Sequence, residues 1–160
     1  MEPIELAQEI ANYLQKVNKI YDSEEKNITV VTGFIPDCLT NKDKKAMCPR
    51  IIVRPTEITD SVQDLAGDMT EIKILITFLT YTEIDDDAYR LIYNWISKNR
   101  RELLKKRCFG DANLTLPMTT KVLDEDAQPK PMWGGYILAT YRTQSIEEEG
   151  LIEDEYGYEV

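Results

Sequence analysis

The sequence predicts an α+β fold, a mainly antiparallel sheet of about five strands with an N-terminal helix and a long central helix packed on it. Apolar residues recur every three to four positions in two segments, which is the spacing of amphipathic helices. Shorter segments are rich in β-branched and aromatic residues. The order is helix, three strands, helix, two strands. With 160 residues of which 42% are hydrophobic, we expect a single domain over 1–146 and an acidic C-terminal extension over 147–160.

Five segments have the composition of strands and are bounded by glycine, proline or polar residues. They span 28–35, 50–59, 70–81, 113–123 and 136–146. The third is the strongest, because its alternate residues make one fully apolar face, and we place it at the centre of the sheet. Pro55 predicts that the second strand lies at an edge or ends there.

The helices are expected over 3–21 and 85–107. The second begins with three aspartates and finishes among lysines and arginines, an order that complements the helix dipole. Gly110 is expected to stop it. Its predicted apolar stripe consists of Ala88, Leu91, Ile92, Trp95, Ile96 and Leu103. The polar segment 37–49 is predicted to be a long exposed loop.

Composition excludes several classes of function. The chain has no histidine, and its three cysteines have no CxxC spacing, which excludes a four-ligand zinc site within one chain and a histidine-based triad. We expect reduced thiols and a cytoplasmic setting. No segment approaches the roughly 18 apolar residues of a membrane span, and the first residues do not resemble an export signal.

The net charge of −10 is unevenly distributed. Seven of the 29 acidic residues lie within 147–160, which leaves 22 acidic against 19 basic residues in the rest of the chain. The body is therefore close to neutral, and this balance does not favour a general nucleic-acid binder.

One pattern matches an enzyme. Asp37 after a proline, followed later by Glu71 and Lys73, has the letters of the PD…ExK nucleases, in which two acidic side chains hold Mg²⁺ and a lysine assists the attacking water. So loose a pattern arises by chance, and here Asp37 opens a polar segment while Glu71 begins a strand. A Mg²⁺-dependent nuclease is kept as an alternative.

Two other groups have both a binding and a structural interpretation. Asp85-Asp86-Asp87 has the hard oxygens that Mg²⁺ or Ca²⁺ prefers, but at a helix start it is more simply a cap. Trp133-Gly134-Gly135 is followed by a strand, whereas a phosphate loop leads into a helix. We therefore expect a structural hinge there, with Trp133 as an anchor, and no metal or cofactor site.

Three charged groups are candidate interface residues. The first is the lysine cluster in 37–49. The second is the basic end of the long helix, whose cations span nearly three turns and cannot all share one face. The third is the acidic extension. A solvated surface and a docking surface are both open for each of them. The residues are Lys42, Lys44, Lys45, Lys98, Arg100, Arg101, Lys105, Lys106, Arg107, Glu153, Asp154 and Glu155. Apolar residues interleave with the acids of the extension, so we weigh simple disorder against a strand or clasp added to a second subunit.

Three segments carry a resemblance to a known family. EIKILITFLTY, DDDAYRLIYNWISKNRRELLKKR and PMWGGYILATYR resemble the tail terminator (tail completion, neck) proteins of long-tailed bacteriophages and of phage-tail-like bacteriocins. The resemblance covers roughly residues 1–146, rests on these segments and on the order of the elements, and includes no catalytic signature. The extension after Glu147 has no counterpart in it.

The resemblance implies a structural protein of a virion tail or tail-like particle, assembled in the bacterial cytoplasm. Such subunits form a ring, commonly a hexamer, on the last ring of the tail tube, where they end polymerisation and offer a surface to a head connector or collar. In contractile tails they also meet the sheath protein. The lysines of 37–49 would then face an acidic ring surface or DNA passing through the lumen. A head-tail connector is the neighbouring alternative.

Overall fold

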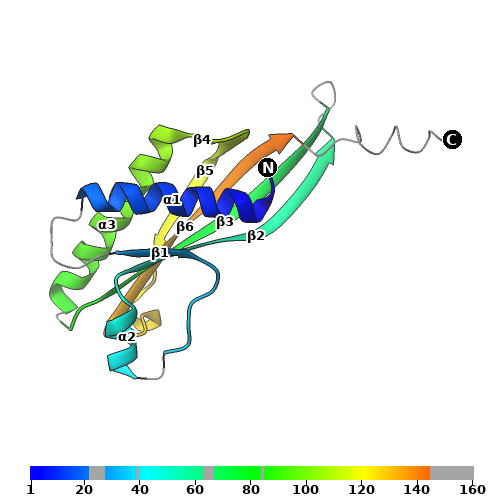
Figure 1. Ribbon diagram of the computed structural model, residues 1–160. Coiled ribbons are helices and arrows are strands. Elements are labelled where there is room, and N and C mark those ends of the chain that lie inside the picture. The colour runs from blue at the N-terminus through cyan, green and yellow to red at the C-terminus, as the bar shows by residue number, and fades with distance from the viewer. Residues whose placement is uncertain (22–27, 39, 63–66, 84, 145–160) are drawn as a thin grey trace.

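The computed structural model describes residues 1–21, 28–38, 40–62, 67–83 and 85–144, and the acidic extension lies outside them. Three α-helices, six strands and one 3₁₀ helix form the described part (Figure 1). They are α1 (Pro3–Tyr21), β1 (Thr29–Thr32), α2 (Asn41–Met47), β2 (Arg50–Val62), β3 (Asp68–Tyr81), α3 (Asp85–Lys106), β4 (Cys108–Phe109), β5 (Ala112–Val122), η2 (Glu125–Ala127) and β6 (Met132–Gln144).

The strands form one sheet in the order β1-β2-β3-β6-β5-β4. Every pair is antiparallel except β1 with β2, so the predicted α+β class and mainly antiparallel sheet are confirmed. β3 lies at the centre, as its apolar pattern predicted, and pairs with β2 on one side and β6 on the other. β4 is only two residues long and was not predicted from the sequence, and it brings the sheet to six strands.

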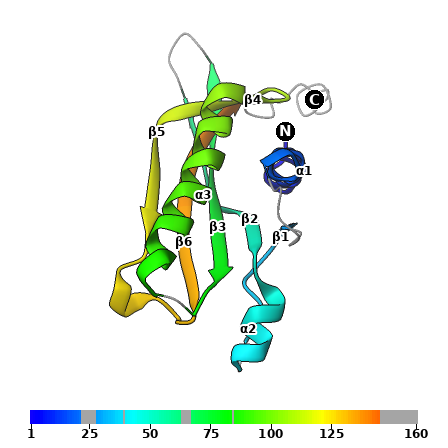
Figure 2. The same cartoon turned by 90° about the vertical axis from the view of Figure 1, so that its left-hand side faces the viewer.

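Both long helices pack on the same face of the sheet. α1 contacts β1 and β2, while α3 contacts β6, β5 and β3. Figure 2 shows α3 lying along the strands and α1 seen end-on beside it. The alternating residues Ile72, Ile74, Ile76 and Phe78 are fully buried beneath them, because every second side chain of a strand points to the same face.

A buried polar cluster joins the two helices where they meet. The Nδ2 atom of Asn18 on α1 donates to Oδ1 of Asn99 on α3 at 2.7 Å, and the indole N–H of Trp95 donates to Oδ1 of Asn18 at 2.9 Å. Asn99 also donates to the carbonyl of Trp95 at 2.9 Å. Both asparagines are almost fully buried, so the cluster orients one helix relative to the other.

The opposite face of the sheet is covered at one end by α2. Met47 of this short helix packs against Ile52, Leu79 and Met132 in a second, smaller apolar cluster. The expected exposed loop over 37–49 is therefore wrong for its central part. Thr40 caps the helix, its hydroxyl accepting from the amide of Asp43 at 3.1 Å. Hydrogen bonding of this kind and a single buried methionine are weak signals in a polar sequence.

The long helix differs from its prediction in two details. Its bounds agree within one residue, and five of the six predicted stripe residues face the core, but Leu91 is 53% exposed. Arg107 ends the helix with a positive φ of 65°, whereas Gly110 lies in the turn between β4 and β5. The left-handed conformation ends a helix whichever residue adopts it, so the glycine was the wrong marker.

At both edges of the sheet, particular residues interrupt the regular backbone edge of the outer strands. Gln15 of α1 donates to the carbonyl of Ile28 and accepts from the amide of Val30, two groups of the β1 edge directed away from β2. Pro55 lies past Val53, the last residue of β2 that pairs with β1, and the register shifts beside it. β5 contains Pro117 inside a second register shift. The expected edge position of Pro55 agrees with this arrangement.

Candidate interaction surfaces

The three residues of the nuclease pattern do not come together. Cys38, next to Asp37, lies beside Met47 at the end of the sheet where Leu79 is found. Glu71 is eight residues from Leu79 along β3, roughly 26 Å at the rise of a strand. Glu71 instead forms an ion pair with Arg142, Oε2 to Nε at 2.7 Å.

The other residue of that pattern is paired as well. Lys73 lies 3.6 Å from a carboxylate oxygen of Glu57 on the neighbouring strand. Among the residues that the structure describes, no group of three or more Cys, Asp or Glu side chains is arranged to hold a metal ion. Within the same residues, no helix is long and apolar enough to cross a membrane.

The three lysines of 37–49 have different surroundings in the structure. Lys44 is half-buried and its Nζ atom lies 3.2 Å from the carbonyl of Pro129, so it ties α2 to the segment before β6. Lys42 and Lys45 are exposed on the same helix. α2 stands at one end of the molecule, away from α1 and α3 (Figures 1 and 2). Two of the three lysines are therefore presented on a projecting element.

The basic end of α3 contains an outward row of cations. Lys98, Arg101 and Lys105 follow one another at three and four residues, the spacing of one helix face, and all three are exposed. We call these three residues the basic stripe. Arg101 donates to Ser97 at 3.3 Å, and Lys105 lies 3.5 Å from Glu102.

The other cations of this end point elsewhere. Arg100 is half-buried, Lys106 lies over the rings of Tyr13 and Phe109, and Arg107 donates to the carbonyl of Leu104 at 2.9 Å. The cations therefore do not all share one face, as the sequence indicated, yet half of them do. The acidic candidates Glu153, Asp154 and Glu155 lie outside the described residues, and their role stays a prediction.

The Trp133-Gly134-Gly135 segment differs from the predicted hinge. Both glycines lie inside β6, in regular register with Leu79 and Phe78, and neither has a positive φ. Gly135 is needed for close packing instead, because a Cβ atom there would lie 2.6 Å from Cδ1 of Ile96 and 2.8 Å from the carbonyl oxygen of Lys121. Trp133 is only 4% exposed.

A glutamine side chain fixes the start of β6. Gln128 accepts from the amide of Gly134 at 2.6 Å and donates to the carbonyls of Gly134 and Leu123 at 3.1 and 2.8 Å. Its side-chain amide thus makes the hydrogen bonds to this part of β6 that the backbone of a neighbouring strand would otherwise make. The sequence carried no signal for this contact, since a glutamine in a polar connection is ordinarily exposed.

Beside this segment lies a groove that sequence reasoning missed. It has a volume of about 390 Å³ and is lined by side chains of α3, of the end of β5, of the connection to β6 and of the start of β6. They are Tyr89, Tyr93, Val122, Leu123, Asp124, Glu125, Gln128 and Trp133. We call it the tyrosine groove. The available signal was the pair of tyrosines four residues apart, next to the apolar stripe of the helix.

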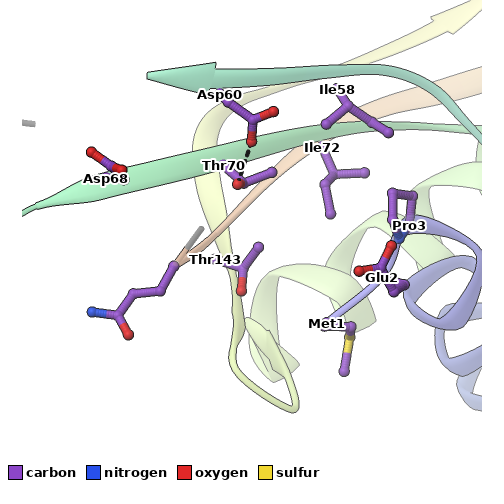
Figure 3. A pocket seen from close by; sticks show the side chains of 10 residues that line it. Met1, Glu2, Pro3, Ile58, Asp60, Asp68, Thr70, Ile72 and Thr143 are labelled. Carbon is purple, nitrogen blue, oxygen red and sulfur yellow. Dashed lines mark hydrogen bonds between the residues drawn. The ribbon is translucent and has the colours of Figure 1, made fainter. Parts of the chain in front are cut away.

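A second groove of about 400 Å³ lies between the start of α1 and the strands β2 and β3 (Figure 3). Its lining includes Pro3 from the start of α1 and Ile58 and Ile72 from the strands, and Asp60 and Asp68 line it from the two strands as well. The hydroxyl of Thr70 donates to Asp60 at 2.6 Å. The charged side chains of the lining, Glu2, Asp60 and Asp68, are all acidic, which suits a basic partner.

Two ionisable groups near the β4–β5 turn have shifted pKa values. The hydrogen bond from the Thr143 hydroxyl, 2.8 Å long, lowers the pKa of Asp111, and the amino group of Met1 at 3.5 Å acts in the same direction. Burial raises the pKa of Tyr141 well above its ordinary value. These groups are held in place by packing and hydrogen bonds, and neither borders a cluster suited to acid–base chemistry in the described part of the chain.

Comparison with known proteins gives a weak structural similarity. No family model and no curated protein matches the sequence. Among solved structures, the chain is similar to a chain of the "Virion of native gene transfer agent (GTA) particle", with a TM-score of 0.46 and 11% sequence identity over 91% of this chain and 100% of that one. At these values the similarity carries no conclusion about fold or function.

Proposed function

We propose that this chain is a structural subunit of a phage tail or phage-tail-like particle, which caps the tail tube as a ring and offers a docking surface to a head connector or collar. One observation carries the proposal. The three segments that resemble tail terminator proteins become β3, α3 and β6, and these form a single packed unit. β3 and β6 pair from Met69 to Tyr81, and α3 lies across both. The resemblance therefore concerns the core that positions every other element.

The distribution of surface groups supports an assembly role. A ring needs a heterologous interface, with two unlike patches on each subunit. The basic stripe and the acidic-lined grooves are such unlike patches, and exposed apolar side chains accompany them, among them Ile58, Tyr89 and Leu91.

The projecting helix α2 is our candidate for the contact with the tail tube. It stands clear of the helical layer and presents Lys42 and Lys45 to the outside. These lysines would face an acidic ring surface or passing DNA. A sheath protein, if the tail is contractile, would contact the outer side of the ring. The acidic extension is a further candidate contact for a neighbouring copy or another particle protein.

The first experiment is the mass of the purified chain by light scattering after size exclusion, alone and mixed with its cognate tube protein. We expect a ring-sized oligomer, or a monomer that caps tubes and fixes their length in electron micrographs. A monomer that leaves tube assembly unchanged contradicts the proposal. A chain that binds a portal ring and does not bind tubes is a head-tail connector instead. Cleavage of DNA that requires Mg²⁺ and is lost in Lys73→Ala would support the nuclease alternative.

A matched pair of variants tests the contact through α2. Lys42→Glu/Lys45→Glu reverses the two exposed cations of α2, and Lys16→Glu/Lys19→Glu makes the same change of charge on exposed positions of α1. We expect the first variant to cap tubes less well than the native chain, and the second to cap them normally. Equal behaviour of the two variants would show that α2 does not face the tube.

A further inference from the structure

We propose that copies of this chain associate head to tail, with the basic stripe of one copy seated against the tyrosine groove of the next. The inference deepens the proposed function and rests on it in one respect, namely that the copies form a ring. The surfaces themselves are identified from the described residues alone. Their occupant is a second copy of this chain.

The tyrosine groove has the properties of a docking site. Tyr89 and Tyr93 are 52% and 50% exposed, which is high for such large side chains, and their rings contact each other edge to face with centroids 6.3 Å apart. The buried indole N–H of Trp133, which also lines the groove, has no hydrogen-bond partner among the described residues. Exposed aromatic side chains that contact each other are typical of a surface that becomes covered.

The rim of the groove is acidic. Asp124 and Glu125 line it, and Asp126 follows in the same 3₁₀ turn. Glu125 forms an ion pair with Lys130 at 2.9 Å, and Lys130 lies over the ring of Trp133. One base against three acids leaves a negative surplus at the mouth of an aromatic groove. Cations on long aliphatic stems fit this combination, because the stem contacts the rings and the charge reaches the rim.

The basic stripe offers such cations on the same helix. Its members are exposed and lie in one outward row, with Leu91 and Asn94 continuing the row toward the start of α3. Exposed aliphatic surface at Leu91, 53% accessible, gives this row an apolar portion as well. The charges of the stripe and of the groove rim are therefore opposite in sign and comparable in number.

Geometry prevents one copy from satisfying both surfaces itself. The tyrosines lie on the flank of α3 that faces the end of β5, whereas the stripe points outward on a different face. Lys98, the stripe residue nearest in sequence, lies five residues from Tyr93 and roughly 140° around the helix from it, and Lys105 lies twelve residues away, roughly 18 Å along the axis. The proposed contact therefore joins different copies. Because the two patches differ, the association is heterologous, and it forms a ring when the rotation between neighbouring copies closes.

Charge reversal with rescue tests the inference. Variant one is Arg101→Glu/Lys105→Glu, variant two is Asp124→Lys/Asp126→Lys, and variant three combines all four changes in one chain. We expect the first two to raise the dissociation constant between copies roughly tenfold each, since like charges then meet, and the third to return it close to the native value. The measurement is sedimentation equilibrium or light scattering at low and high salt.

The control variant Lys16→Glu/Lys19→Glu carries the same change of charge as variant one and should associate normally. If variant one and variant two both associate as strongly as the native chain, this inference is overturned while the ring proposal stands. Loss of association in variant three, with its fold intact by circular dichroism, also counts against it. A native chain that stays monomeric with and without tubes removes the proposed function together with this interface.

Discussion

At the scale of single residues, Gly135 shows how a glycine can be required without any unusual backbone. Its φ is ordinary, and it pairs regularly with Phe78. What excludes a larger residue is the approach of Ile96 from the helix and of Lys121 from the neighbouring strand. Sequence reasoning recognised that the two glycines were structural but assigned them to a bend, because close packing between distant segments has no local signature.

The neighbouring glycines give a matched prediction. In Gly135→Ala the new methyl group meets a strand carbonyl that cannot move aside, so we expect a loss of about 2–3 kcal/mol in the free energy of unfolding. Gly134→Ala should lose less than about 1 kcal/mol, since its nearest neighbour is the flexible end of Leu79 at 3.3 Å. Urea denaturation of the two variants checks this. Equal losses would refute the packing explanation.

At the scale of secondary structure elements, the crossing of α1 and α3 depends on Asn18. This side chain contacts both Asn99 and Trp95 of the other helix. Apolar packing alone tolerates several helix orientations, whereas hydrogen bonds of fixed geometry favour one. The sequence indicated both helices from their periodicity but not this pair, because an asparagine on a helix gives no sign of its distant partner.

We therefore expect Asn18→Leu to cost about 2–4 kcal/mol of unfolding free energy, as the buried amide of Asn99 and the indole of Trp95 lose their partner. Asn12→Leu, on the exposed side of the same helix, should cost less than about 0.5 kcal/mol. Thermal unfolding followed by circular dichroism separates the two. Near-native stability in Asn18→Leu would mean that packing alone fixes the crossing.

The helices and strands also show how much of the fold can be predicted from the sequence. Strong periodicity predicted the bounds of α1, β3 and α3 to within two residues, because those segments bury one face. α2 was missed because only Met47 of its seven residues is buried. The tyrosine groove was missed for a related reason, since it is made by three elements that come together only when the sheet forms. Patterns along the chain indicate which residues are buried, and they do not indicate which distant segments lie next to one another in the fold.

At the scale of the whole molecule, the described domain is closed by its own core, and the acidic extension is expected to lie outside it. Removal of residues 147–160 takes away seven of the 29 acidic residues. We expect the unfolding free energy to change by less than about 0.5 kcal/mol, as for other surface changes. Denaturant unfolding of the shortened chain measures this. A loss of several kcal/mol would place the extension within the fold and move the predicted domain boundary.

The interrupted sheet edges have a consequence for solubility. A particle under assembly gathers many copies of one chain in a small volume, the condition in which exposed strands add to one another and grow into fibrils. Here Gln15 occupies backbone groups on one outer strand, while Pro55 and Pro117 break the regular edge on both sides of the sheet. In the proposed particle, these interruptions would favour contacts between copies through side chains over pairing of strand edges.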